Sequence, residues 1–296
     1  MFENILGNEK NKKSLEKAIK LNKFSHSYIF WGIEGIGKKI VAKEFAKNIL
    51  CIKKQENCNC KSCIEIDSNN NPDFQLIEPN EGKVKIEQIR EMQRKVAEKP
   101  IISNKKVYII DNADTMTIEA QNCLLKTLEE PPEYITIILI CANEDNLLST
   151  IKSRCTRIYF ESIDTEEIKK YISQNYPDQE ISENIINLSQ GSIGKVLKLN
   201  ENKSIYENIE KIFLSMQNKD LIEIVQMSEE IYKAKEEISS ILDYMNVILL
   251  KLSKQNIKYI SCIEIVENTK KRLKANSNYD MCIDNLLFNM TFIIHN

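Results

Sequence analysis

A glycine-rich stretch near the start of the chain has the spacing of a phosphate-holding loop. Residues 32–39 read Gly-Ile-Glu-Gly-Ile-Gly-Lys-Lys and fit the pattern G-x-x-x-x-G-K, with a β-rich run before them and a helical run after them. In this pattern the glycines let backbone amides surround a phosphate at the start of a helix, and the lysine reaches its outer oxygens. We therefore predict a nucleotide-binding loop made by Gly32, Gly35, Gly37 and Lys38. The alternative is a tight strand-to-helix turn without a ligand.

Two positions that ATP hydrolysis needs hold unsuitable residues. Lys39 stands where the motif has a Ser or Thr hydroxyl for magnesium, and an ammonium group cannot bind a cation. Asp111 ends an apolar run, as expected of a magnesium-holding aspartate, but Asn112 follows it where an ATPase has a glutamate that activates water. Asp114, two residues further on, is expected to point elsewhere. We expect ATP and Mg²⁺ to bind weakly, if at all, and without productive hydrolysis.

Four cysteines lie in a polar insert after the helix that follows this loop. Cys51, Cys58, Cys60 and Cys63 have the spacing C-x6-C-x-C-x2-C. In a cytosolic chain such a cluster is typical of a tetrahedral structural zinc site rather than of disulfides. The C-x2-C step is standard for zinc, whereas the C-x-C step is tighter than the usual pair. The alternative is four free surface thiols, which would be prone to oxidation.

Arginine is scarce in this chain, so each arginine is a candidate for a site that needs a planar fork of donors. Arg154 lies in the triplet Ser-Arg-Cys, after an apolar run and a short helix. At this place in a phosphate-loop sheet, an arginine tends to lie on an exposed edge, from which it could reach a nucleotide held by a neighbouring subunit. The alternative is an ordinary surface arginine, which position alone favours.

The elements that position these residues alternate between β-rich and helical patterns over the first 160 residues. The β-rich runs are Ser27–Trp31, Phe74–Glu78, Lys106–Asp111, Ile135–Cys141 and Arg157–Phe160, and the clearest helical runs are Lys38–Leu50, Ile86–Glu98 and Thr117–Glu129. Continuous apolar strands are typical of a parallel sheet covered by helices on both faces. This half of the chain is therefore predicted to be an α/β domain.

The second half of the chain is predicted to be all helical. All seven glycines lie at or before Gly194 and all six prolines at or before Pro177. After them, apolar residues recur at helical spacing, which favours four or five helices. Between Glu161 and about Asn200 we expect two or three short helices.

Composition excludes several classes of protein. The chain has 296 residues, of which 42% are hydrophobic and 28% charged, and a net charge of −2. These values exclude a disordered or collagen-like chain, and the near-neutral charge argues against tight nucleic-acid binding through overall charge. No run approaches the ~18 apolar residues of a membrane-spanning helix, and the first residues lack a signal-peptide pattern. We expect a cytoplasmic protein without a membrane partner.

The motifs occur in the order found in a known family. The matching segments are residues 5–9, residues 26–32 with the glycine loop, the cysteine insert, residues 111–114, the run Leu-Leu-Lys-Thr-Leu-Glu-Glu-Pro-Pro at 124–132, and Ser-Arg-Cys at 153–155. With these motifs the first 160 residues resemble the AAA+ clamp-loader subunits of bacterial DNA polymerase III. The second half resembles them at Gly191-Ser192 and in its helical character.

The resemblance implies three domains. Residues 1–160 would form an α/β P-loop AAA+ domain with a five-stranded parallel sheet and a zinc-binding insert at about 51–63. Residues 161–203 would form a small helical lid domain, and residues 204–296 an all-helical collar for oligomerisation. The implied partners are the motor subunits and the delta subunit in a hetero-pentameric ring and, through the complex, the sliding clamp and primed DNA.

The resemblance also implies roles for single residues. Ser-Arg-Cys carries the arginine finger in this family, so Arg154 would act in trans on ATP bound by the adjacent motor subunit. Zinc modules recur at the cysteine insert, normally with C-x2-C-x2-C. Relatives that hydrolyse ATP have Gly-Ser-x-Arg in the lid, whereas residues 191–194 read Gly-Ser-Ile-Gly.

Three departures from the family pattern favour a non-hydrolysing subunit. Lys39, Asn112 and Gly194 each replace a part with its own role in phosphoryl transfer. The chain is therefore predicted to be a stator-type subunit of the polymerase holoenzyme with no ATPase activity of its own. The alternative is an ATP-hydrolysing motor-type subunit. A P-loop kinase would need an arginine-rich lid, and a zinc-dependent nucleic-acid-binding module would need a more basic chain.

Overall fold

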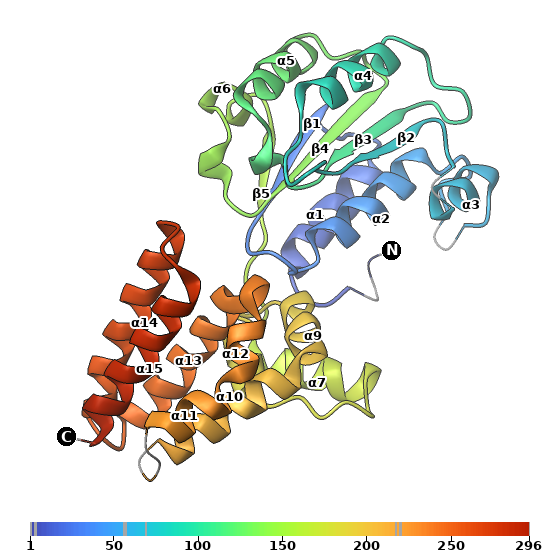
Figure 1. The fold of residues 1–296 in the computed structure, drawn as a ribbon. Coiled ribbons are helices and arrows are strands. Elements are labelled where there is room, and N and C mark those ends of the chain that lie inside the picture. Colours follow the sequence, from blue (N-terminus) through green and yellow to red (C-terminus); the bar gives the residue numbers. More distant parts are fainter. Residues whose placement is uncertain are drawn as a thin grey trace. The chain divides into compact units, whose positions relative to one another are not determined.

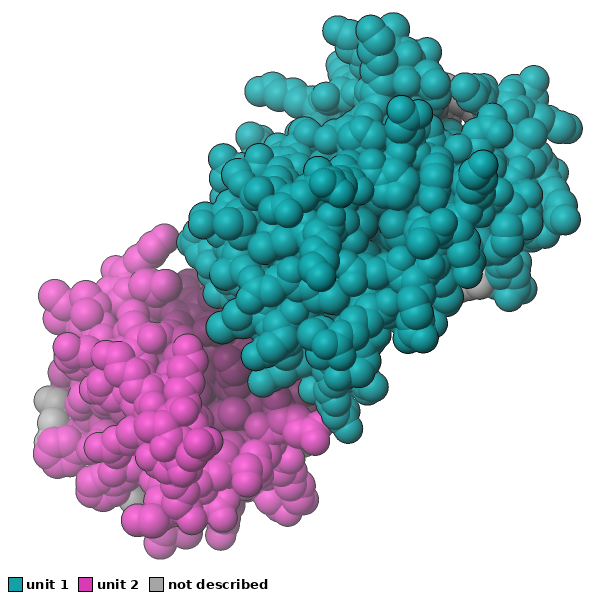
Figure 2. Space-filling model, turned by 90° about the horizontal axis from the view of Figure 1, so that it is seen from above, with its two compact units in different colours: residues 1–171, 191–194 teal, residues 172–190, 195–296 magenta. Residues whose placement is uncertain are grey.

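The chain folds into two compact units. The computed structural model describes residues 2, 5–55, 58–68, 70–216, 218 and 221–295. Unit 1 comprises Met1–Tyr171 and Gly191–Gly194, and unit 2 comprises Ile172–Gln190 and Lys195–Asn296 (Figure 2). Glu56 and Asn57, which belong to the predicted zinc insert, lie outside the described residues. The domain limits at residues 160 and 203 stay a prediction.

Unit 1 is built on a five-stranded parallel sheet with the strand order β2-β3-β4-β1-β5 (Figure 1). The strands are β1 (Ser27–Trp31), β2 (Phe74–Ile77), β3 (Lys106–Ile110), β4 (Ile135–Cys141) and β5 (Thr156–Tyr159). Strands β3 and β4 are buried along their whole length, as expected for a parallel sheet between two helical layers. The five predicted strands are confirmed to within one residue at either end.

Helices cover both faces of this sheet, with α4 (Ile86–Val96) and α5 (Ile118–Glu129) on one face and α1 (Glu9–Lys20) and α2 (Lys38–Leu50) on the other (Figure 1). Side chains alternate along β1 accordingly. Ile29 belongs to the core that includes α4 and α5, whereas the Tyr28 ring meets Phe45 of α2 edge-on at 5.4 Å between centroids. The three predicted helices of this half are confirmed.

Short helices connect the strands of unit 1. They are α3 (Lys61–Asp67), the 3₁₀ helices η1 (Ala113–Thr115) and η2 (Glu144–Asn146), and α6 (Ser149–Lys152), with α7 (Thr165–Asn175) following β5. Helix α5 begins where the Thr117 hydroxyl accepts a hydrogen bond from the Ala120 amide, and it ends just before Pro131. Helix α6 ends two residues before Arg154, a candidate site residue.

Within its described residues, unit 2 contains helices and no strands. Its helices are α8 (Glu183–Leu188), α9 (Ile193–Glu201), α10 (Lys203–Ser215), α11 (Leu221–Met227), α12 (Glu229–Lys233), the 3₁₀ helix η3 (Lys235–Glu237), α13 (Ile238–Ser253), α14 (Lys258–Lys274) and α15 (Tyr279–His295). The last three pack in sequence order, α13 on α14 and α14 on α15. Buried apolar side chains such as Ile209, Ile241, Cys262 and Ile283 form its core, so the all-helical prediction is confirmed.

The number of helices in this half differs from the prediction of four or five. Six α-helices, α10 to α15, lie within the described residues after Asn202. The extra break falls at Ser228, which is buried and turns its hydroxyl onto the carbonyl of Ile224. Such a side-chain bond competes with the helical ladder, and a sequence pattern of apolar residues does not register it. Within the described residues, no helix combines the length and the apolarity that crossing a membrane requires.

Candidate functional site

The glycine-rich loop joins β1 to α2 and has the backbone conformation that its glycines allow. Gly32, Gly35 and Gly37 have φ angles of 144°, 75° and 100°. These are values that residues with a Cβ rarely adopt. A Cβ at Gly32 would also lie 2.5 Å from the carbonyl oxygen of Phe160. The loop therefore requires glycine, and it contains Gly32, Gly35, Gly37 and Lys38, four of the predicted nucleotide-binding residues.

Lys38 is turned onto the loop itself. Its side chain is buried, and its Nζ donates to the carbonyl oxygens of Gly32 at 2.5 Å and Ile33 at 2.8 Å. Burial lowers the pKa of Lys38, because desolvation penalises the ammonium form. The group that would hold a phosphate is thus occupied by backbone oxygens of its own loop.

Lys39 bridges two acidic side chains at the carboxyl ends of β2 and β3. Its Nζ lies 2.5 Å from Glu78 Oε1 and 2.9 Å from Asp111 Oδ2. Burial lowers the pKa of Lys39, but the two hydrogen-bonded carboxylates raise it by more, so the net shift of the pKa is upward. The same ion pair lowers the pKa of Glu78. The ammonium group therefore serves as the counter-ion of Asp111, the carboxylate predicted to hold magnesium.

The residues after Asp111 are arranged for structure rather than for proton transfer. Asn112 has a left-handed φ of 46°, and its amide N–H donates to Asp111 Oδ1 at 3.0 Å. Asp114 accepts the amide hydrogens of Ala142 and Asn143 at 3.1 and 3.0 Å, beyond the end of β4. Asp114 therefore points away from Asp111's ion pair, as its position predicts.

A segment far away in sequence packs on the glycine loop. The Ser192 hydroxyl donates to the carbonyl of Glu34 at 2.7 Å, and the Gly194 amide donates to the carbonyl of Gly35 at 3.0 Å. A Cβ at Gly194 would lie 2.9 Å from both the Cα and the carbonyl oxygen of Gly35. The position therefore has no room for a side chain, which no pattern in the sequence indicates.

Arg154 follows α6 and is about one third exposed. Its Nη2 lies 2.8 Å from Glu129 Oε1 at the end of α5, and its Nη1 donates to the carbonyl of Thr150 at 2.9 Å. The Ser27 hydroxyl, on β1, donates to the Arg154 carbonyl at 2.8 Å. No pattern in the sequence marks Glu129 or Ser27 as partners of this arginine, although each lies in a segment with family motifs.

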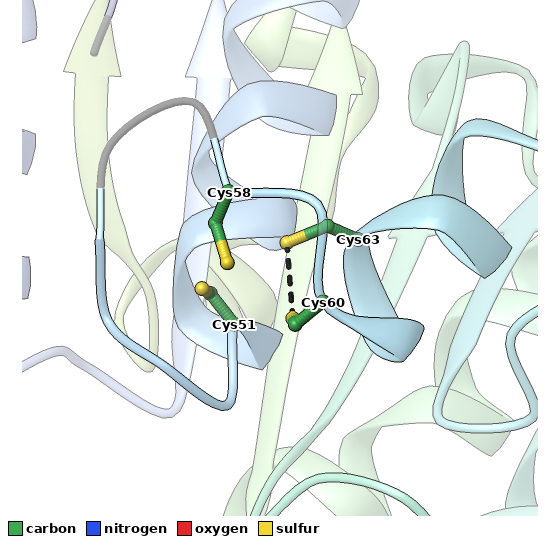
Figure 3. Close-up of side chains that lie close together, drawn as sticks. All are labelled: Cys51, Cys58, Cys60 and Cys63. Atoms are coloured by element: carbon green, nitrogen blue, oxygen red, sulfur yellow. Dashed lines mark hydrogen bonds between the residues drawn. The ribbon is translucent and has the colours of Figure 1, made fainter.

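The four predicted zinc ligands come together in one cluster (Figure 3). Cys51 follows α2, Cys58 lies in the insert, and Cys60 and Cys63 flank the start of α3. All four Sγ atoms lie within 4.8 Å of one another, and those of Cys60 and Cys63 are 3.5 Å apart. Thiolates bound tetrahedrally to zinc at ~2.3 Å are ~3.8 Å apart. The residues therefore fit a four-sulfur metal site despite the C-x-C step.

The thiols of this cluster differ in acidity. Burial raises the pKa of Cys60, but amide hydrogen bonds from Cys63 and Ile52 outweigh it and lower that pKa to about 6. Burial raises the pKa of Cys63. A thiolate is the form that binds a metal, so Cys60 is prepared for ligation at neutral pH.

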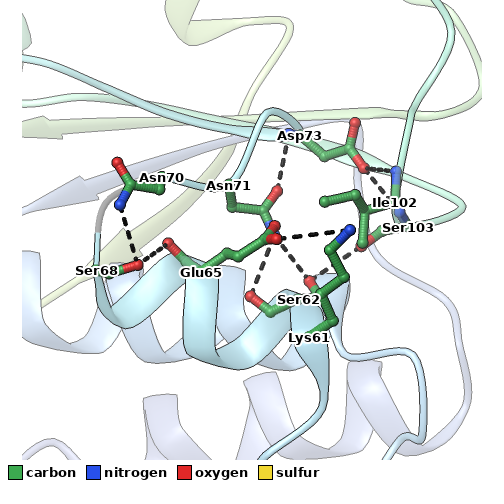
Figure 4. Close-up of polar contacts among 9 residues, drawn as sticks. All are labelled: Lys61, Ser62, Glu65, Ser68, Asn70, Asn71, Asp73, Ile102 and Ser103. Carbon is green, nitrogen blue, oxygen red and sulfur yellow. Dashed lines mark hydrogen bonds and ion pairs between the residues drawn. The ribbon is translucent and has the colours of Figure 1, made fainter.

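A buried polar network ties this cluster to the sheet (Figure 4). The side-chain amide of Asn71 donates to the Ser62 carbonyl at 3.1 Å and to its Oγ at 3.0 Å, and its oxygen accepts the Asp73 amide at 2.8 Å. Ser62 lies in α3 between two of the cysteines and is fully buried. Asn71 therefore fixes the helix that carries Cys63 to the start of β2.

The carboxylate of Asp73 extends the network to the loop before β3. It accepts the amide hydrogens of Ile101, Ile102 and Ser103 at 2.7–2.8 Å, and Figure 4 shows the last two of these partners. Asp73 is 1% exposed, so these backbone donors take the place of water around a buried charge. One side chain thereby binds three consecutive amides of this loop.

Residues 7–164 match a protein family described as DNA polymerase III, delta subunit. This stretch contains the glycine loop, the cysteine cluster, Asp111 and Arg154, and it spans more than half of the chain. The chain belongs to this DNA polymerase III family. The predicted resemblance to its clamp-loader subunits is confirmed.

Two relatives from Bacillus subtilis indicate how far the likeness extends. The delta-prime subunit of DNA polymerase III is 32% identical over 202 residues, which cover 68% of this chain and 61% of that protein. The tau subunit is 40% identical over 172 residues, which cover 56% of this chain and 30% of that protein. The aligned part is thus less than two thirds of the length of either relative.

A solved structure supports the fold of the whole chain. The DNA polymerase III gamma-subunit-related protein from Thermotoga maritima superposes with a TM-score of 0.60 over 95% of this chain and 99% of that one, at 17% identity. At this identity the comparison speaks to fold alone. Together with the five-stranded parallel sheet, it confirms the predicted class, a P-loop AAA+ domain followed by helical regions.

Proposed function

We propose that this chain is the non-hydrolysing, stator-type subunit of a DNA polymerase III clamp loader. In this role it helps the complex to load the sliding clamp onto primed DNA. The observation that carries the proposal is the Lys39 ammonium group bridging Glu78 and Asp111. A cation of the protein itself stands where a working site needs magnesium.

Phosphoryl transfer in P-loop proteins depends on a metal ion held by a hydroxyl and an aspartate. Here Lys39 supplies no hydroxyl and neutralises Asp111, while Lys38 is directed to the carbonyls of its own loop. Asn112 cannot accept a proton from water at neutral pH. These features support weak binding of ATP and Mg²⁺ and no turnover by the isolated chain.

Arg154 is proposed to be an arginine finger that acts in trans on ATP held by a neighbouring motor subunit. Its partial exposure supports this role, because a finger must reach out of its own domain. The proposed assembly is a hetero-pentameric ring with motor subunits and a delta subunit, in which residues 161–203 serve as lid and residues 204–296 as collar. Such a replication complex would work in the cytoplasm.

We propose zinc as the metal of the Cys51, Cys58, Cys60 and Cys63 cluster. Four thiolates at tetrahedral spacing select Zn²⁺ over hard cations such as Mg²⁺. A site with four protein ligands has no open position, so its role would be structural. The metal would hold the insert against the end of α2.

The alternative proposal is an ATP-hydrolysing motor-type subunit. The intact glycine loop with Lys38 and the 40% identity to the Bacillus subtilis tau subunit favour it. Steady-state ATP turnover by the purified chain separates the two proposals. Turnover at a motor-like rate that disappears in a Lys38→Ala variant would establish the motor-type subunit.

The stator proposal is tested in a reconstituted loader. Arg154→Ala should lower the DNA-stimulated ATPase of the complex, since an arginine finger supplies on the order of 10³-fold or more at its own site. The overall loss will be smaller, because other sites of the ring keep their own fingers. Arg154→Lys should rescue in part, because an ammonium group cannot hold two phosphate oxygens.

Arg157→Ala is the matched control. Arg157 lies three residues further on in β5 and pairs with Glu144 at 3.3 Å, outside the motif. The control complex should behave like the wild type. Full ATPase and clamp loading with Arg154→Ala would refute the trans-acting role.

A further inference from the structure

Three elements of unit 1 hold Arg154 in place. Its main chain is fixed by Ser27, which is 3% exposed and donates to the Arg154 carbonyl at 2.8 Å. Its guanidinium group is held by Glu129 Oε1 at 2.8 Å and by the Thr150 carbonyl at 2.9 Å. Strand β1, helix α5 and helix α6 thus each contribute one contact to the same residue.

The contacts leave part of the guanidinium group available. A guanidinium carries five N–H donors. Nη1 donates to Thr150 O and to Ser153 Oγ at 3.4 Å, and Nη2 forms an ion pair with Glu129. Within the described part of the chain, the Nε hydrogen has no acceptor. At least this donor therefore stays ready for another oxygen-rich group.

Glu129 lies at a fixed place in the chain. It is the last residue of α5, and after one intervening residue Pro131 and Pro132 stop the helix. The neighbouring Glu130 is exposed and forms no ion pair within the described ranges. Of these two adjacent glutamates, Glu129 contacts Arg154 and Glu130 does not, within the described residues.

We propose that Glu129 is a positioning residue that orients the Arg154 guanidinium group toward a phosphate held by the neighbouring subunit. The inference rests on the proposed function of Arg154 as a trans-acting finger. An arginine side chain loses rotamer freedom when it binds. A carboxylate that restricts the side chain beforehand raises the fraction of time in which the free donor faces outward.

The ion pair is suited to orient the arginine without sequestering it. Glu129 is about half exposed and Arg154 about one third exposed, and pairs of this kind are weak because water competes for both groups. Because Glu129 pairs with Nη2 and not with Nε, a phosphate oxygen that binds the Nε hydrogen leaves the ion pair in place. The carboxylate therefore shapes the approach of the finger rather than blocking it.

The test uses the reconstituted loader with this chain as wild type, Glu129→Gln, Glu129→Asp, Arg154→Ala and the double variant Glu129→Gln with Arg154→Ala. Glu130→Gln is the matched control, with the same chemical change one residue away. DNA-stimulated ATPase gives kcat and KM for each complex, and gel filtration checks that each ring assembles. Glutamine keeps the shape of the side chain and removes its charge.

We expect Glu129→Gln to lower kcat by about two- to fivefold, the range that a partly exposed ion pair supplies. KM for ATP should stay unchanged, because the residue touches no ground-state nucleotide. Glu129→Asp should recover part of the loss, and Glu130→Gln should match the wild type. In the Arg154→Ala background, Glu129→Gln should cause no further loss.

Three results would overturn the inference while leaving the trans-acting arginine intact. The first is a wild-type kcat for Glu129→Gln. The second is a kcat above that of the wild type, which would mean that the carboxylate competes with phosphate. The third is an equal loss of kcat from Glu129→Gln in the presence and in the absence of Arg154. Full activity of Arg154→Ala would instead overturn the proposed function together with the inference. The two failures are therefore distinguishable.

Discussion

The ammonium group of Lys39 lies 2.9 Å from the carboxylate of Asp111, at the point where a working P-loop site brings magnesium to an aspartate. Lysine at this position lacks the hydroxyl that would bind the metal, and it also changes the charge of the site. It supplies a positive charge in the place of the ion, and Glu78 fixes that charge from the other side at 2.5 Å. Asp111 thereby has a counter-ion that belongs to the chain itself.

Lys39→Thr should therefore make nucleotide binding depend on magnesium. The substitution provides a hydroxyl and frees Asp111 as a metal ligand. We expect a fluorescent ATP analogue to bind about tenfold more tightly with Mg²⁺ than with a chelator, equivalent to ~1.4 kcal/mol. The wild-type chain should show a difference within about twofold. Hydrolysis should still be absent, because Asn112 cannot serve as a base.

Lys43→Thr is the control for this binding experiment, because Lys43 lies one turn further along α2 and pairs with neither of the carboxylates that Lys39 bridges. It should bind the analogue as the wild type does. Equal binding of the analogue to Lys39→Thr in Mg²⁺ and in chelator would mean that the ion pair does not close the site.

Gly194→Ala should destabilise the protein, although alanine normally stabilises a helix relative to glycine by roughly 0.5–1 kcal/mol. Gly194 is the second residue of α9, and its added Cβ would lie 2.9 Å from backbone atoms of Gly35, which cannot rotate away. We expect a loss of about 1–3 kcal/mol in the free energy of unfolding, as for other overpacked sites. Urea denaturation measures it.

Lys198→Ala, in the same helix, shows the ordinary effect of alanine and should change stability by less than about 0.5 kcal/mol. A stabilising Gly194→Ala would show that the segment 191–194 does not pack on the glycine loop as described.

The local part of the site could be predicted from the sequence. The strands have runs of Ile, Val and Leu long enough to identify a buried parallel sheet, and the phosphate loop is specified by glycines within six residues. The four cysteines lie within thirteen residues, so their meeting depends little on the rest of the fold. In both cases one short segment of sequence is enough to predict the local structure.

The long-range part of the site could not be predicted. Glu129 and Arg154 are far apart in the chain, as are Gly35 and Gly194, and no periodicity relates either pair. The chain has 43 acidic residues, so nothing in its composition marks Glu129 as the partner of the arginine. Such contacts depend on which strand neighbours which, and the order β2-β3-β4-β1-β5 fixes that only after folding.

The cysteine cluster should retain zinc through purification. Protein prepared without added metal should contain about one zinc per chain, and Cys60→Ser should contain much less. Because α3 begins at this cluster, chelation should speed hydrogen exchange of its amides by at least about tenfold. Metal analysis and exchange with mass spectrometry measure the two effects.

Cys123→Ser is the control for the metal, because the Cys123 thiol lies in α5 and donates to Gln93 Oε1 at 3.1 Å, apart from the cluster. It should keep the full zinc content. A metal content near zero in the wild type, with four freely titratable thiols, would refute the zinc proposal.

Asp73→Asn should be among the most destabilising single changes in unit 1. The Asp73 carboxylate is 1% exposed and accepts three amide hydrogens, from Ile101, Ile102 and Ser103. The side-chain oxygen of an asparagine can accept at most two of them. The NH₂ group is a donor, so it would face the third amide N–H without forming a hydrogen bond. Hydrogen bonds to a charged group contribute about 1.5–3 kcal/mol each, and a buried donor without an acceptor costs about 1–3 kcal/mol.

We therefore expect Asp73→Asn to lower the free energy of unfolding by about 2–4 kcal/mol in urea denaturation. Asp67→Asn is the matched control, because Asp67 is exposed and only pairs with Lys47 at 2.6 Å. Its loss should stay below about 1 kcal/mol, as for other exposed ion pairs. Exchange should also quicken selectively at the amides of residues 101–103 in Asp73→Asn. Equal urea midpoints for the two variants would mean that the loop before β3 is held by contacts other than this carboxylate.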